Sequence, residues 1–173
     1  MAEYQFVTRW LIAAPIEQVW EEILNTKSWH LWWDAVDSVV DLEAGDSNGV
    51  GTVQRFVWKT PLSYTLTFNT RVIRLEAPIV MEAIAIGDVE GRGLWELTTL
   101  DRGTEIYYTW TVRTTKRWMN ALAVIARPLL EWNHNIIMQQ GGKGLAQRLQ
   151  TELLASENVE PSKLFSKAEG LKY

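Results

Sequence analysis

The sequence contains no cysteine. This absence excludes disulfide bonds, thiol nucleophiles and cysteine-based zinc sites, and it is consistent with a reducing compartment, so we expect a cytoplasmic protein. Histidine is scarce as well, with only His30 and His134. Two histidines without cysteine do not supply the ligand sets of catalytic zinc, so we predict no metal site.

Basic residues are outnumbered by acidic ones, and the formal net charge is -4. Nucleic-acid binding needs clustered Lys and Arg, so we expect no nucleic-acid partner. Arg, Glu, Pro or Asn interrupts each apolar run well before the roughly 20 residues that cross a bilayer, and we predict no transmembrane segment. The first residues show neither the basic stretch nor the apolar run of a secretory signal.

Sequence motifs for nucleophilic or nucleotide chemistry are missing too. There is no Gly-x-Ser-x-Gly elbow and no dinucleotide-binding loop, and Gly141 to Gly144 follows a helical pattern where a phosphate-binding loop would follow a strand. We therefore predict no cofactor.

Tryptophan, in contrast, is abundant, with ten residues in a chain of 173. Trp29, Trp32 and Trp33 stand together and need a surface that covers them. The length and the 47% hydrophobic content are those of one globular domain. We expect a ligand-binding domain over residues 1–155 and a polar, mobile C-terminal tail over residues 156–173.

The first third of the chain predicts one strand and two short helices. Residues 4–13 alternate between two faces as a strand does, and Tyr4 and Phe6 share one of them. Pro15 is placed to begin a first helix with an apolar stripe. Residues 28–36 form a second short helical or irregular segment.

Residues 37–114 have the pattern of six strands. The turns between them are too short for crossover helices, so neighbouring strands should be antiparallel and form a meander. With the first strand, this predicts seven strands. The expected turns are Gly45 to Gly49, Thr60-Pro61, Ala77-Pro78, Gly91-Arg92-Gly93 and Asp101-Arg102-Gly103.

After Thr115 the pattern becomes helical. Pro128 should bend this helix, residues 141–144 should loosen it, and residues 145–154 should be its last turns. At 100° per residue, one stripe should face the sheet. Its members are Trp118, Leu122, Ile125, Leu129, Asn133, Ile136 and Gln140.

Several segments, in order, are similar to one protein superfamily. They are Ala14 to Trp20, which reads AP-x-x-x-V-W, the tryptophans of Trp29 to Trp33, Gly87 to Leu97, Thr104 to Val112, and Arg127 to Gly142. Their order and spacing resemble the START/birch-pollen-allergen-like (SRPBCC) superfamily, in its polyketide cyclase/dehydrase branch, over about residues 5 to 154. The resemblance implies an α+β helix-grip fold: a seven-stranded curved antiparallel sheet wrapped around a long C-terminal helix, with two short helices after the first strand.

The resemblance also implies an internal cavity, because members of this superfamily bind sterols, lipids, polyketides, hormones or quinones, and only some are catalysts. A hydrophobic small molecule is therefore the expected partner; the oligomeric state is not indicated. The residues expected to bind it are Trp33, Phe56, Trp58, Tyr64, Phe68, Trp95 and Trp110 from the tryptophan cluster and the strands, and Leu129, Asn133, Ile136 and Gln140 from the helix.

Two polar residues stand on the apolar helix stripe. Asn133 and Gln140 need hydrogen-bond partners, which either a ligand or the protein backbone and water can supply. His134 should point outward to solvent. Glu82 and Arg55 each share a strand face with apolar residues, and that face is either the cavity wall or the solvent side of the sheet.

Three functions fit these features. The first is a carrier or sensor that binds an apolar ligand, oriented by Asn133 and Gln140. The second is a polyketide cyclase or dehydratase type of enzyme in which Glu82, Arg55 or Tyr108 assists proton transfer in the same cavity. The third is an interaction module that docks a partner or a membrane through exposed Trp29, Trp32 and Trp33.

Overall fold

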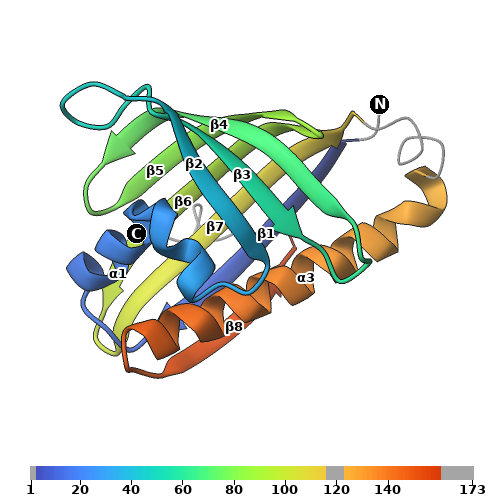
Figure 1. The fold of residues 1–173 in the computed structure, drawn as a ribbon. Coiled ribbons are helices and arrows are strands. Elements are labelled where there is room, and N and C mark those ends of the chain that lie inside the picture. The colour runs from blue at the N-terminus through green and yellow to red at the C-terminus, as the bar shows by residue number, and fades with distance from the viewer. Residues whose placement is uncertain (1–2, 116–122, 161–173) are drawn as a thin grey trace, which may run out of the picture.

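In a computed structural model, the chain forms one curved sheet with helices on its concave side (Figure 1). The structure describes residues 3–115 and 123–160. The elements are β1 (Glu3–Ile12), α1 (Ile16–Leu24), the 3-10 helix η1 (Thr26–Leu31), β2 (Val36–Glu43), β3 (Val53–Lys59), β4 (Thr65–Glu76), β5 (Val80–Gly87), β6 (Val89–Leu100), β7 (Gly103–Thr114), α3 (Ala123–Arg148) and β8 (Leu153–Val159).

The sheet has the strand order β2-β3-β4-β5-β6-β7-β1-β8, and each strand pairs antiparallel with its neighbours. The α+β class, the six-stranded meander and the two short helices after β1 are confirmed. From β2 to β7 short connections favour this order, because each strand lies beside the one that follows it, whereas β1 pairs with the distant β7 and β8. In Figure 1 the sheet curls around α3, and α1 and η1 lie near the C-terminal end of that helix.

The expected number of strands, seven, is wrong, because the chain adds β8 beside β1. The helix ends at Arg148, and residues 145–154 are not its last turns. Gln150, with φ of 54°, and the Thr151 hydroxyl, which donates to the carbonyl oxygen of Ala13 at 2.6 Å, turn the chain back to the sheet. β8 thus extends to Val159, past the expected domain end at residue 155. Residues 161–173 of the expected tail lie outside the described residues.

One expected turn lies inside a strand. Gly91-Arg92-Gly93 belongs to β6, and the β5–β6 hairpin turns at Gly87 and Asp88 instead. A Cβ atom on Gly91 would lie 2.1 Å from the carbonyl oxygen of Thr111 on β7. Glycine at this position therefore lets the backbone of the neighbouring strand approach closely. In the sequence, such a glycine looks the same as a glycine in a turn.

Helix α3 continues through Pro128. Its glycines lie in close contact with the rest of the fold. A Cβ on Gly141 would lie 2.4 Å from Cε2 of Trp33, and one on Gly144 would lie 1.7 Å from the carbonyl oxygen of Trp32. The indole Nε1–H of Trp33 donates to the carbonyl oxygen of Ile137 at 2.8 Å. These glycines let the helix lie directly against the tryptophan segment, rather than loosening it.

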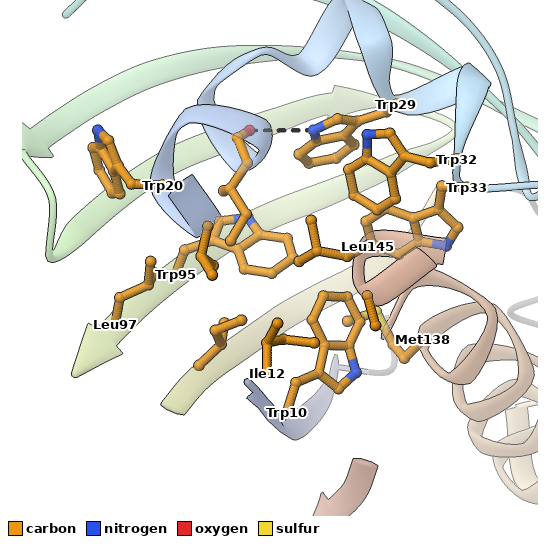
Figure 2. Close-up of a cluster of buried hydrophobic side chains, with 14 of the residues drawn as sticks. Trp10, Ile12, Trp20, Trp29, Trp32, Trp33, Trp95, Leu97, Met138 and Leu145 are labelled. Atoms are coloured by element: carbon orange, nitrogen blue, oxygen red, sulfur yellow. Dashed lines mark hydrogen bonds between the residues drawn. The ribbon is translucent and has the colours of Figure 1, made fainter. Parts of the chain in front are cut away.

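The three clustered tryptophans are buried. Trp29, Trp32 and Trp33 expose 5%, 7% and 1% of their surface, and in Figure 2 they pack with Trp10 and Trp95. The hypothesis of a docking patch made by these rings is therefore wrong. Their large apolar faces form the core between the helices and the sheet.

Among the helices of the described residues, none combines the length and the apolar character needed to cross a bilayer.

The contact at Gly144 predicts a large effect of one methyl group. In Gly144→Ala the new Cβ meets backbone, which cannot rotate away, so we expect the free energy of unfolding to fall by about 2 kcal/mol despite the higher helix propensity of Ala. Chemical denaturation of the purified variant measures this. The adjacent exposed Lys143→Ala is the control and should change stability by less than about 0.5 kcal/mol. Equal stability of both variants would contradict the close contact between α3 and the backbone of Trp32.

Candidate ligand-binding site

A cavity of about 120 Å³ lies between α3 and the concave face of the sheet. A second space of about 70 Å³ adjoins it, and the two share part of their walls. The shared residues are Trp29, Trp58, Phe68, Trp95, Tyr108 and Trp110. Since a cavity of about 150 Å³ can hold benzene, the two together offer room for one or two rings.

All seven residues expected from the tryptophan cluster and the strands lie in these walls. Trp33, Trp58, Tyr64, Phe68, Trp95 and Trp110 line the larger space, and Phe56 lines the smaller one. The rings pack on one another, with centroids 4.2 Å apart for Trp95 and Tyr108 and 5.9 Å apart for Phe68 and Trp110. The result is a preformed aromatic wall. Its alternation along each strand follows from the β period of two.

The helix contributes a different face from the expected one. Of the described stripe residues, only Asn133 lines the cavity. Leu129 is 46% exposed, Gln140 is exposed, and Ile136 lies outside the cavity wall, so the expectation that they face the sheet is wrong. Trp118, Leu122 and the side chain of Ile125 lie outside the described residues.

The inward face of α3 is the expected stripe moved by one residue. It carries Leu130, Asn133, His134, Ile137, Met138, Gly141 and Leu145. The error has a physical cause: this face includes glycine and two polar residues, whereas the solvent side carries Leu129 and Trp132, both nearly half exposed. An apolar count therefore favours the wrong side of the helix.

Sequence reasoning also missed wall residues at the start of the chain. Tyr4 and Phe6 line the cavity together with Val89 and Val112. The signal was present, because Tyr4 and Phe6 share a strand face with the core residue Trp10. The remaining unanticipated wall residues, apart from those on α3, are Trp29 and Leu66, whereas Tyr108 lies in the cavity as the enzyme hypothesis expected.

Several polar atoms of the wall are buried without hydrogen-bond partners. They are the hydroxyl oxygen of Tyr4, Nε1 of Trp58 and Oδ1 of Asn133. Asn133 is only 5% exposed. Each unsatisfied group costs roughly 1–3 kcal/mol, so a ligand that hydrogen-bonds to them would recover part of this free energy.

His134 does not point to solvent as expected. Its ring lines the cavity and stacks on Phe6, with centroids 4.6 Å apart, and its Nε2 lies 3.5 Å from Oγ1 of the buried Thr8. Burial lowers the pKa of His134 to about 4. The imidazole is therefore uncharged at neutral pH, and this wall carries no positive charge from it.

Tyr108 places its hydroxyl in the cavity. Its side chain lines both adjoining spaces, and a Cβ on Gly93 would lie 3.0 Å from its hydroxyl oxygen. Burial raises the pKa of Tyr108, so the phenol stays protonated at neutral pH. It can donate a hydrogen bond to a bound molecule.

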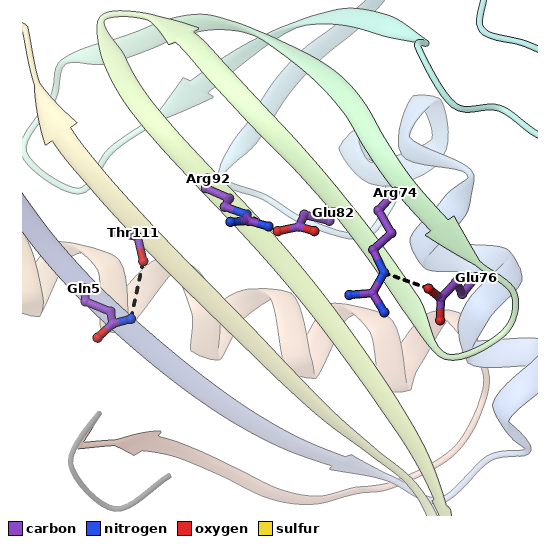
Figure 3. Close-up of polar contacts among 6 residues, drawn as sticks. All are labelled: Gln5, Arg74, Glu76, Glu82, Arg92 and Thr111. Atoms are coloured by element: carbon purple, nitrogen blue, oxygen red, sulfur yellow. Dashed lines mark hydrogen bonds and ion pairs between the residues drawn. The ribbon is translucent and has the colours of Figure 1, made fainter. Parts of the chain in front are cut away.

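Glu82 and Arg55 lie outside the cavity. Glu82 is 3% exposed and forms an ion pair with Arg92 from the next strand, on the face of the sheet turned away from α3 (Figure 3). Arg55 donates from Nε to Oδ1 of Asn69 at 3.1 Å and is exposed. Neither side chain can assist proton transfer in the cavity, and that part of the enzyme hypothesis is wrong.

Within the described residues, no three His, Asp or Glu side chains group as metal ligands would.

A family model described as "Polyketide cyclase / dehydrase and lipid transport" matches residues 4–150. The chain belongs to this family. The family model ends shortly after α3, so β8 lies outside the match. No curated protein shows significant sequence similarity to the chain.

Solved structures share the fold at low identity. The Zhui aromatase/cyclase from a Streptomyces species superposes with a TM-score of 0.71 at 19% identity, covering 86% of this chain and 94% of that one. TTHA0849 from Thermus thermophilus has a TM-score of 0.67 at 18% identity, covering 86% and 97%. A conserved protein from Geobacillus kaustophilus has a TM-score of 0.70 at 12% identity, covering 91% and 100%. At such identities the likeness concerns the fold.

The pKa of His134 predicts a pH dependence of stability. It is about 4 in the folded protein and 6.5 ordinarily. Between these values the unfolded chain binds more protons, so stability falls as pH falls, by about 3 kcal/mol in total. Urea unfolding at several pH values measures this loss, which His134→Gln should largely remove.

The other histidine provides the control. His30 is exposed, and His30→Gln should keep the pH dependence of the wild type between pH 6.5 and 4. If His134→Gln kept it too, the buried neutral state of His134 would be wrong.

Proposed function

We propose that the protein binds a hydrophobic small molecule of lipid, polyketide or quinone type in this cavity, and acts as its carrier or sensor. The observation that carries the proposal is an aromatic cavity with hydrogen-bonding atoms left unpaired in its wall. Ligand sites in proteins commonly combine apolar walls with a few polar groups of this kind. The family description supports the proposal, since it includes lipid transport.

The first experiment is native mass spectrometry of gently purified protein, because a preformed apolar pocket tends to retain its ligand. A stoichiometric adduct that is released on denaturation, and is apolar when identified, is the expected result. A mass equal to that of the chain alone, combined with no binding of added apolar compounds, would overturn the proposal.

Filling the cavity should abolish binding without unfolding the protein. Leu130 lines the cavity and is partly buried, whereas its neighbour Leu129 is 46% exposed. We expect Leu130→Trp to weaken binding of a neutral two-ring dye such as 1-naphthylamine at least tenfold, because the larger ring occupies the ligand space. Dye fluorescence titration measures this.

Leu129→Trp is the matched control, because it makes the same change outside the cavity. Its dye affinity should equal that of the wild type. Equal loss in both variants, or no loss in Leu130→Trp, would place the dye elsewhere.

A second candidate is an enzyme of polyketide cyclase or dehydratase type that uses the same cavity. Tyr108 favours it, because its phenol lines the cavity and stays protonated at neutral pH. Such a group can stabilise negative charge that develops on a carbonyl oxygen during ring closure. His134, uncharged and beside the same space, is the other group able to exchange a proton.

The enzyme hypothesis makes a separate prediction. If the protein cyclises an acyclic poly-β-ketone, Tyr108→Phe should lower the rate of aromatic product formation about 100-fold, because one donor to the developing oxyanion is lost. Dye affinity should change little, since the ring remains. Product absorbance follows the reaction, and Glu82→Gln, which lies outside the cavity, serves as control. Turnover unchanged in Tyr108→Phe would remove Tyr108 from the mechanism.

A further inference from the structure

We infer that the cavity selects an uncharged ligand that carries a hydroxyl group, and that this hydroxyl donates a hydrogen bond to Oδ1 of Asn133. The inference rests on the proposed function and adds the chemical class of the ligand. It follows from two independent features of the described wall: the absence of charged side chains and the presence of unpaired polar atoms.

The described wall residues include no Lys, Arg, Asp or Glu. His134 is the one wall residue among them that titrates near neutral pH in its ordinary state, and burial keeps it uncharged. A carboxylate or phosphate bound here would lose its hydration without gaining a counter-charge, which costs far more than apolar contact returns. The cavity thus disfavours fatty-acid anions and phosphorylated compounds.

The unpaired atoms decide which polar group the ligand needs. Oδ1 of Asn133 accepts hydrogen bonds only, and it is buried without a donor. A ligand ketone or ether cannot satisfy it, whereas a hydroxyl can. The same hydroxyl can also accept a bond, and the same cavity wall contains two donors with unpaired polar atoms, the Trp58 indole and the Tyr4 phenol.

Asn133 is held in place by its helix. Close contacts of Gly141 and Gly144 with the tryptophan segment, and the bond from Trp33 to the carbonyl oxygen of Ile137, fix the part of α3 that follows it. Because the helix backbone is rigid, the amide cannot move out of the cavity to reach solvent without a change of the whole helix. Asn133 is therefore a specificity-determining residue.

Three probes of one size test the inference: 2-naphthol, 2-methylnaphthalene and 2-naphthoate. Two fused rings match the room in the adjoining spaces. Displacement of the two-ring dye 1-naphthylamine from the purified protein at neutral pH gives their affinities. We expect 2-naphthol to bind about fivefold more tightly than 2-methylnaphthalene, and 2-naphthoate at least 100-fold more weakly than 2-naphthol.

The variant Asn133→Leu keeps the side-chain size and removes the acceptor. It should bind 2-methylnaphthalene at least as well as the wild type and lose the preference for 2-naphthol. Asn135→Leu makes the same change two residues away, outside the cavity wall, and should keep that preference. If Asn133→Leu does not fold, the comparison of the three probes on the wild type still tests whether the cavity selects an uncharged ligand with a hydroxyl group.

The outcomes separate the two proposals. If neither the dye nor any probe binds, the proposed function fails. If 2-methylnaphthalene binds as tightly as 2-naphthol, or 2-naphthoate binds as tightly as either, the cavity is a binding site but the inference about its selectivity is wrong. Retention of the hydroxyl preference in Asn133→Leu would also overturn the role given to Asn133.

Discussion

The close approach of α3 to the tryptophan segment is the constraint on which the site depends. Gly141 and Gly144 leave no side chain between the helix and Trp32 or Trp33, and the Trp33 indole binds a helix carbonyl. Helix α3 and the tryptophan segment therefore pack tightly at one end of the cavity. One turn earlier, the helix carries Asn133, Ile137 and Met138 instead, and the space between these side chains and the sheet is the cavity.

The tryptophans have two roles at this junction. Trp10 and Trp32 belong to the buried core, while Trp33 and Trp95 present one side to the core and another to the cavity. Large rigid rings lose little conformational entropy when ordered, so they can hold a cavity open with few contacts on one side. This explains why a chain of this size carries more tryptophan than a filled core requires.

Charge is segregated by the sheet. Ion pairs such as Glu82–Arg92 and Arg113–Glu90 lie on strands that also contribute apolar residues to the cavity walls. The alternation of a strand enforces this separation, since adjacent residues point to opposite sides. In the cavity, the groups that can form hydrogen bonds with a ligand are neutral amide, phenol, indole and imidazole groups. Each such hydrogen bond is weak, but it requires a defined direction.

Sequence by itself determined the order of the elements, the antiparallel meander and most of the aromatic wall, because a period of two and short turns are local properties. It did not determine which face of α3 turns inward, because that face includes glycines, which have no side chain and so give no hydrophobic signal. It also did not determine β8, because residues Leu153–Val159 show no clear alternation. Glu82 could not be placed either, because its partner Arg92 is assigned only by strand register. Only the tertiary structure decided that Asn133 and His134 lie together in the cavity, for their surroundings come from β1, β3 and β6, which are distant in sequence.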